Sequence, residues 1–257
     1  MCELFGVSAR ESFRVNELLD AFYHHSDEHR DGWGLAVFRG HGVSMEKEPV
    51  KATNSAYLIR RMSRDIEAAN LFAHIRLATI GRIEYCNCHP FIWDDESGRT
   101  WTMIHNGTFF NGSKLTGYID RQEGTTDSER FLLYIVDAMS AAYEKKGAEL
   151  TFDERFEIID DIIVALSDDN KINMLLYDGD YMYVHTNCEG SLYCWREDGK
   201  RIFATRPVVM DGWEQLPLNR LLVYKNGEMI REGTVHSNSF RDEDHDYAPL
   251  MSAFSEL

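Results

Sequence analysis

Runs of residues with the alternating pattern of β-strands lie both before and after a central pair of helical segments. The first group of predicted strands covers 2–9, 32–39, 43–48, 70–77 and 99–105. The second group consists of short runs, broken by Asp-Gly and Asn-Gly pairs typical of hairpin turns, at 171–177, 181–186, 191–196, 201–205, 220–225 and 228–233. This order predicts an α+β fold with two mainly antiparallel sheets and helices on their outer faces.

The two central helical segments begin at typical capping residues. Thr126 with Glu129, and Thr151 with Glu154, have the spacing of a capping box, in which a hydroxyl and a carboxylate satisfy backbone N–H groups at a helix start. Apolar residues follow each box at helical spacing. Two shorter helices are predicted among the early strands, around 15–22 and 55–66.

Composition places the chain among globular proteins. Its 257 residues are 44% hydrophobic and show no break in composition, so we expect a single domain over 1–257, with a surface tail at 237–257. The net charge of −16 argues against binding to nucleic acids or anionic membranes, which relies on Lys and Arg. No apolar run approaches the roughly 20 residues of a membrane span, and the odd number of cysteines suggests reduced thiols, so a cytoplasmic location is expected.

Cys2 combines two reactive groups if Met1 is removed, because the residue then carries both a thiol and a free α-amine. The amine has a reference pKa of roughly 7.7–8.0, which suits it to taking the proton from the thiol. The plainer interpretation is a small hydrophobic residue at the start of a buried strand. On its own, Cys2 does not decide between the two.

Four further motifs follow Met-Cys in the order His-x-Arg-x-Ala-Thr-x-Gly (74–81), Asn-x-His-Pro-Phe (87–91), His-Asn-Gly (105–107) and Asp-Ser-Glu (127–129). With them, the chain resembles the glutaminase domain of class II glutamine amidotransferases, which are N-terminal-nucleophile (Ntn) hydrolases. The resemblance extends over about 2–235. It implies a four-layer αββα sandwich, a mature chain that begins at Cys2, and hydrolysis of the side-chain amide of glutamine to glutamate and ammonia through a thioester on that cysteine.

The resemblance also implies how the charged head group of the substrate is held. Arg76 would bind the α-carboxylate, and a guanidinium can do so through two parallel hydrogen bonds. Asp127 would bind the α-ammonium, and Thr79 and His89 lie in family motifs and are candidate substrate-binding residues. The plainer interpretations are a surface ion pair for Arg76, stabilisation of Asp127 by the helix dipole, and a structural histidine.

Asn106 and Gly107 are the candidate oxyanion hole by the same resemblance. The side-chain amide of Asn106 and the backbone N–H of Gly107 would donate to the oxygen of the tetrahedral intermediate. An Asn-Gly pair also commonly forms a tight turn between strands. Both interpretations remain open from the sequence.

No metal or cofactor is expected. Cys86, Cys88 and His89, and likewise His185, Cys188 and Cys194, do not give the paired spacing of a structural zinc site. The expected partner is a small molecule, glutamine or a γ-glutamyl compound. A synthase subunit or a second copy of the chain is a further candidate partner.

Three functional alternatives follow. The first is a glutaminase or amidotransferase, and the second is a hydrolase of γ-glutamyl amide bonds in small metabolites or peptides, as in stand-alone members of the family. Leu77 stands where the synthases commonly have an aromatic residue, which leaves selection beyond the γ-glutamyl group open. The third, from another class, is a non-catalytic protein that binds a metabolite or regulates a partner.

Overall fold

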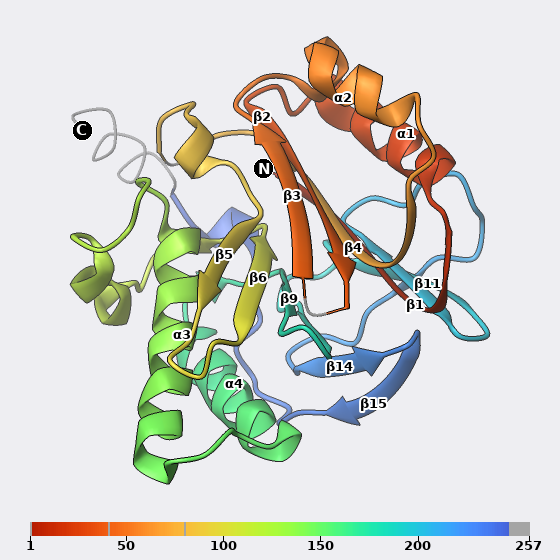
Figure 1. The fold of residues 1–257 in the computed structure, drawn as a ribbon. Helices are drawn as coiled ribbons and strands as arrows, with labels where there is room; N and C mark the ends of the chain where they lie inside the picture. The colour runs from red at the N-terminus through yellow and green to blue at the C-terminus, as the bar shows by residue number, and fades with distance from the viewer. Residues whose placement is uncertain (1, 41, 80, 247–257) are drawn as a thin grey trace.

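Two antiparallel sheets form the centre of the molecule. The computed structural model describes residues 2–40, 42–79 and 81–246. The larger sheet has seven strands in the order β13-β11-β12-β1-β4-β2-β3, and the smaller has six in the order β15-β14-β10-β9-β6-β5. Figure 1 shows α1 and α2 against the larger sheet and α3 and α4 against the smaller one.

The larger sheet consists of β1 (Glu3–Arg14), β2 (Gly32–Arg39), β3 (Gly42–Glu48), β4 (Glu67–Arg76), β11 (Tyr193–Glu197), β12 (Lys200–Ala204) and β13 (Glu214–Gln215). The smaller sheet consists of β5 (Phe91–Asp94), β6 (Thr100–His105), β9 (Met174–Tyr177), β10 (Met182–His185), β14 (Leu222–Lys225) and β15 (Glu228–Glu232). A separate pair is formed by β7 (Thr108–Phe109) and β8 (Asn170–Lys171).

The α-helices are α1 (Asn16–His24), α2 (Ala56–Met62), α3 (Asp127–Lys146) and α4 (Phe152–Leu166). Short 3₁₀ helices lie at η1 (His25–Asp27), η2 (Ala52–Asn54), η3 (Tyr85–Asn87), η4 (Ser113–Tyr118) and η5 (Asp242–Asp244). None of the described helices is both long and apolar enough to cross a membrane.

Three apolar cores hold the layers together. Successive side chains of a strand point to opposite faces of its sheet, so one strand contributes residues to two cores. In β1, Phe5 belongs to the core under α1 and α2, whereas Leu4 belongs to the core between the sheets. In β6, Met103 packs under α3 and α4, whereas Ile104 faces the other sheet. Helix, sheet, sheet and helix therefore form a four-layer αββα sandwich.

Most of the early elements match the sequence expectations, and β2 has the bounds predicted for it. The predicted 55–66 helix extends too far, because α2 ends at Met62 and Ile66 is a buried residue just before β4. The loop predicted before β6 contains a further strand, β5. The late strands divide between the two sheets, since β11, β12 and β13 join the larger sheet while β9, β10, β14 and β15 join the smaller.

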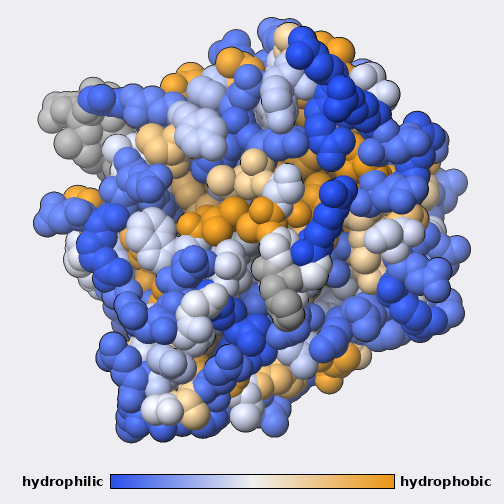
Figure 2. Space-filling view, viewed as in Figure 1, coloured by the Kyte–Doolittle hydropathy of each residue, from blue (hydrophilic) through white to orange (hydrophobic). Residues whose placement is uncertain are grey.

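The surface is mainly hydrophilic on the face seen in Figure 2, where an apolar band lies between β3 and β5. Within the expected surface tail at 237–257, most side chains up to residue 246 are exposed, but one is buried. Phe240 is buried, stacks on Phe110 and forms an isolated parallel bridge with Cys188. The remainder, 247–257, lies outside the described residues.

Candidate active site

Cys2 directly precedes β1, which lies in the interior of the larger sheet between β12 and β4. Both neighbours pair with it over most of its first half, for example Phe5 with Ala204 and with Ala73. The Cys2 sulfur lies 3.5 Å from the carbonyl oxygen of Leu77, which follows β4. Sheet pairing on both sides therefore fixes the position of the thiol.

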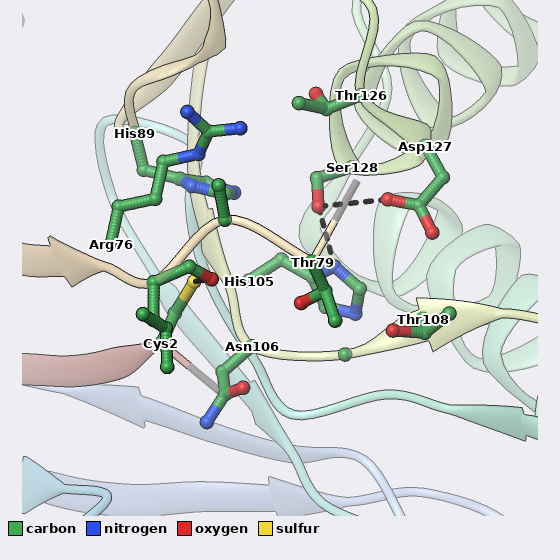
Figure 3. Close-up of a pocket in the computed structure, with 13 residues that line it drawn as sticks. Cys2, Arg76, Thr79, His89, His105, Asn106, Thr108, Thr126, Asp127 and Ser128 are labelled. Carbon is green, nitrogen blue, oxygen red and sulfur yellow. Dashed lines mark hydrogen bonds between the residues drawn. The ribbon is translucent and has the colours of Figure 1, made fainter. Parts of the chain in front are cut away.

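All seven residues proposed from the sequence line one cavity. They are Cys2, Arg76, Thr79, His89, Asn106, Gly107 and Asp127. Figure 3 shows Cys2 between Arg76 and His89 on one side and Asn106 on the other, with Asp127 projecting from the start of α3. We call this space the head-group cavity. Its volume is about 40 Å³.

Arg76 is the last residue of β4 and is only 3% exposed, so it is not the surface residue of the plainer interpretation. Its guanidinium donates to the carbonyl oxygens of Arg82, at 2.8 Å, and of Gly81, at 3.1 Å. Asp31, just before β2, accepts from the backbone N–H of Ala78 at 2.8 Å. These bonds hold the loop after β4 against the guanidinium.

Asp127 is the first residue of α3 and is 6% exposed. Thr126 caps the helix by accepting from the N–H of Glu129, while Asp127 itself accepts from the N–H of Phe109 at 3.0 Å. The predicted capping box is only half formed, because the carboxylate of Glu129 accepts from residues 123 and 124 instead. A negative charge at this position is favoured by the helix dipole and is also well oriented.

Asn106 and Gly107 directly follow β6, which ends at His105, and both line the head-group cavity. The backbone N–H of Asn106 donates to Asn173, and its side chain is 4% exposed with no hydrogen bond to any other described residue. Gly107 packs so closely that an added Cβ would lie 1.9 Å from the carbonyl oxygen of Lys171 and 2.3 Å from a ring nitrogen of His105. Only glycine fits this backbone position.

His105 and Ser128 also line the cavity, although the sequence analysis gave them no role. The Nδ1 of His105 lies 2.9 Å from the hydroxyl of Ser128, and its Nε2 lies 3.3 Å from the carbonyl of Lys171. Because a carbonyl only accepts, Nε2 carries the proton and Nδ1 accepts from Ser128. The imidazole thus links β6 to α3 and supports the turn at Asn106.

His89 is 4% exposed, and neither of its ring nitrogens has a hydrogen-bond partner among the described residues. Its ring packs against His74 at a centroid distance of 4.2 Å. Gly34 allows the backbone of His89 to lie close to β2, since a Cβ on Gly34 would lie 1.9 Å from the carbonyl oxygen of His89. An unpaired, buried imidazole that lines a cavity is suited to contact a bound ligand.

Comparison with known proteins assigns the family. Residues 1–199 match the family described as glutamine amidotransferases class-II. The chain belongs to the class II glutamine amidotransferases. An uncharacterized protein of Methanocaldococcus jannaschii is 30% identical over 261 residues, which cover 90% of this chain and 71% of that protein. This relative is similar in sequence, but its description assigns it no activity.

Solved structures of other class II glutamine amidotransferases share the fold. A predicted glutamine amidotransferase from Pseudomonas aeruginosa superposes with a TM-score of 0.63 at 20% identity, covering 90% of this chain and 100% of that one. The glutamine phosphoribosylpyrophosphate amidotransferase of B. subtilis gives 0.68 at 17% identity, covering 93% of this chain and 50% of that one. At these identities the likeness concerns architecture alone.

Burial shifts the pKa of the Cys2 thiol and of three histidines in and beside the head-group cavity. Burial raises the pKa of the Cys2 thiol, and the positive charge of Arg76 only partly offsets the effect. Burial also holds the pKa of His74 and of His89 well below the usual range and lowers that of His105 to about 4. These three histidines are therefore neutral and weakly basic at pH 7.

Acid is expected to destabilise the fold through such histidines. Burial lowers the pKa of His105 to about 4 and of His185 to about 3, against 6.5 in the unfolded chain. The unfolded state therefore binds more protons between these values, and stability falls as the pH is lowered below 6.5. His105 alone contributes a loss of about 3 kcal/mol by pH 4.

Urea unfolding at pH 7.0, 5.5 and 4.5 measures this loss. The His105→Asn variant is expected to be less stable than the native protein at pH 7 but to lose less stability on acidification. A pH dependence unchanged by the substitution would contradict the assignment to His105.

Proposed function

We propose that the protein hydrolyses the side-chain amide of glutamine, with Cys2 as nucleophile and a glutamyl thioester as intermediate. The observation that carries the proposal is the head-group cavity itself. It places a thiol, a buried guanidinium and a buried carboxylate, on Cys2, Arg76 and Asp127, around one space. An amino acid has complementary charges on its α-carbon, so the two charged side chains would hold it while its side chain reaches the sulfur.

Proton transfer is assigned to the α-amine that Cys2 gains when Met1 is removed. The thiol has a raised pKa, so little thiolate forms spontaneously at pH 7. The cavity histidine His105 has a pKa of about 4 and is a poor acceptor at that pH. An α-amine with a reference pKa of roughly 7.7–8.0 is matched to the task.

The reaction then has two balanced steps. The Cys2 sulfur attacks the δ-carbonyl carbon, the carbon–nitrogen bond breaks, and the thiol proton passes through the α-amine to the leaving ammonia. Water next attacks the thioester, the carbon–sulfur bond breaks, and glutamate and the thiol are released. In both steps the oxygen carries developing negative charge, which the amide of Asn106 and the N–H of Gly107 would stabilise.

Binding of glutamine would change the contacts that Arg76 makes after β4. In the free protein the carbonyl oxygens of Gly81 and Arg82 accept hydrogen bonds from its guanidinium. A substrate carboxylate would replace one of these contacts with a charge-assisted one, which is stronger.

Intact-mass measurement with a thiol-alkylating diazo-ketone analogue of glutamine tests the proposal. We expect a mass that lacks Met1 and a single adduct on Cys2, with glutamine slowing its formation. The same measurement on Asp127→Asn is expected to give slower labelling, because the α-ammonium loses its counter-charge. Labelling at another cysteine, or labelling that glutamine does not slow, would contradict the proposed nucleophile and substrate.

A further inference from the structure

A second cavity, of about 550 Å³, adjoins the nucleophile. It shares Cys2, Leu77 and Asn106 with the head-group cavity but none of the residues assigned to the substrate's charged head group. In Figure 3 the side chain of Asn106 lies on the opposite side of Cys2 from Arg76. When the head group of a γ-glutamyl substrate lies in the head-group cavity, a substituent on its amide nitrogen therefore extends toward the second cavity.

The size of the second cavity exceeds what ammonia needs. Its volume falls within the roughly 300–1,000 Å³ typical of small-molecule sites. Asn106 lines it with a side chain that is 4% exposed and makes no hydrogen bond to another described residue. Because this amide has no hydrogen-bond partner among the described residues, it can contact a ligand in either cavity.

Charged side chains in the second cavity are mostly acidic. The carboxylates are Glu3, Glu28, Glu189 and Asp242, and the other titratable groups that line the cavity are Lys171, Arg206, His29, Tyr193, Cys2 and Cys188. Four carboxylates thus face two permanent cations. The formal balance is negative, which favours a positively charged ligand over a negative one.

Both cations are already engaged by carboxylates. Arg206 lies 3.2 Å from Glu3 and 2.9 Å from Glu28, and Lys171 lies 2.8 Å from Asp242. Glu189, in contrast, is exposed and has no ion pair with any described residue. A ligand carboxylate would compete with existing ion pairs, whereas a ligand ammonium would gain a carboxylate.

We propose that the second cavity binds the leaving amine of γ-glutamyl amides and prefers amines whose far end is positively charged, such as a diamine. The inference rests on the proposed function and names its substrate class. The chemistry is the same: the sulfur–carbon bond forms, the carbon–nitrogen bond breaks, and the amine leaves with the thiol proton instead of ammonia. Water then releases glutamate from Cys2.

Three γ-glutamyl amides of similar length test the charge preference. Their amines are 1,4-diaminobutane, n-pentylamine and γ-aminobutyrate, which end in an ammonium, a methyl group and a carboxylate. Glutamate release from each is compared with release from glutamine at low ionic strength, since salt screens exposed charges. The expected order of kcat/KM is cation, neutral, anion, with about tenfold or more between the first and the last.

Glu189→Gln removes the unpaired carboxylate and is expected to reduce the cation-to-anion ratio about fivefold. Glu144→Gln is the matched control, because Glu144 is an exposed carboxylate on α3 outside both cavities, and it should leave the ratio unchanged. Thermal unfolding of both variants verifies that they fold.

The outcomes separate the two proposals. Faster turnover of the neutral or anionic amide, or a ratio insensitive to Glu189→Gln, overturns the charge preference. Hydrolysis of glutamine with none of the three amides overturns the assignment of the second cavity alone. If neither glutamine nor any amide is hydrolysed, the proposed function fails and this inference fails with it.

Discussion

Replacing Cys2 with alanine is expected to abolish glutamate release, by about 10⁴-fold or more, while the protein remains folded. The substitution removes the sulfur that would form the thioester, and no other thiol of the described residues lines the head-group cavity. Sheet pairing of β1 with β12 and β4 involves the backbone from Glu3 onward, so the loss of one side chain at its edge leaves the fold in place. A coupled assay for glutamate, with circular dichroism and thermal unfolding, measures both effects.

Cys86→Ala provides the matched control for the loss of a thiol. The sulfur of Cys86 contacts the carboxylate of Glu84 and lies outside both the head-group cavity and the second cavity. This variant should keep its glutaminase activity within about twofold, as expected for a change away from such a site. Turnover that survives in Cys2→Ala, or that is lost equally in both variants, would refute the role of Cys2.

Gly107→Ala is expected to lower kcat about 10²–10³-fold with little change in KM, because an oxyanion hole acts mainly in the transition state. A methyl group at this position would lie 1.9 Å from the carbonyl oxygen of Lys171, so the backbone must shift. That shift moves the N–H that would face the oxyanion. Asn106→Ala removes the other donor without such a clash and should lower kcat by a similar factor.

Gly117→Ala controls for the general effect of adding a methyl group to a glycine. Gly117 lies in η4, and nothing comes within 4 Å of the position that its Cβ would take. Kinetics should therefore be native in this variant. If Gly107→Ala raises KM and leaves kcat unchanged, the loop positions substrate and does not stabilise the oxyanion.

The αββα sandwich expected from the family resemblance is confirmed, whereas the residue pattern alone predicted individual elements better than the pairing of strands between them. The bounds of β2 could be predicted because a clear apolar run lies between glycines and a charged residue. The predicted second helix was too long because Ile66 has helical spacing from the residues before it, although α2 ends at Met62. The hairpin of β11 and β12 could be recognised from the Asp-Gly pair between the two strands, but a turn sequence determines only the pairing of adjacent strands. Which sheet receives the hairpin depends on distant strands.

The head-group cavity could be predicted because ordered motifs link it to a known family, and its proposed residues do line one space. The spacing of apolar residues could not have predicted that Cys2 and Asp127 line the same cavity, because the two residues lie in different layers. The second cavity had no such motif. Glu189 and Arg206 come from separate connections around β11 and β12, and no local spacing relates them.

The interior position of β1 has a consequence for biosynthesis. Phe5 pairs with Ala204, so the strand that follows Cys2 gains its partner on one side only after residue 204 has been made. Pairings between such distant residues form slowly, because a long loop must close first. Fragments that stop before β12 leave that edge of β1 open to unwanted association, so β12 must leave the ribosome before β1 is paired on both sides.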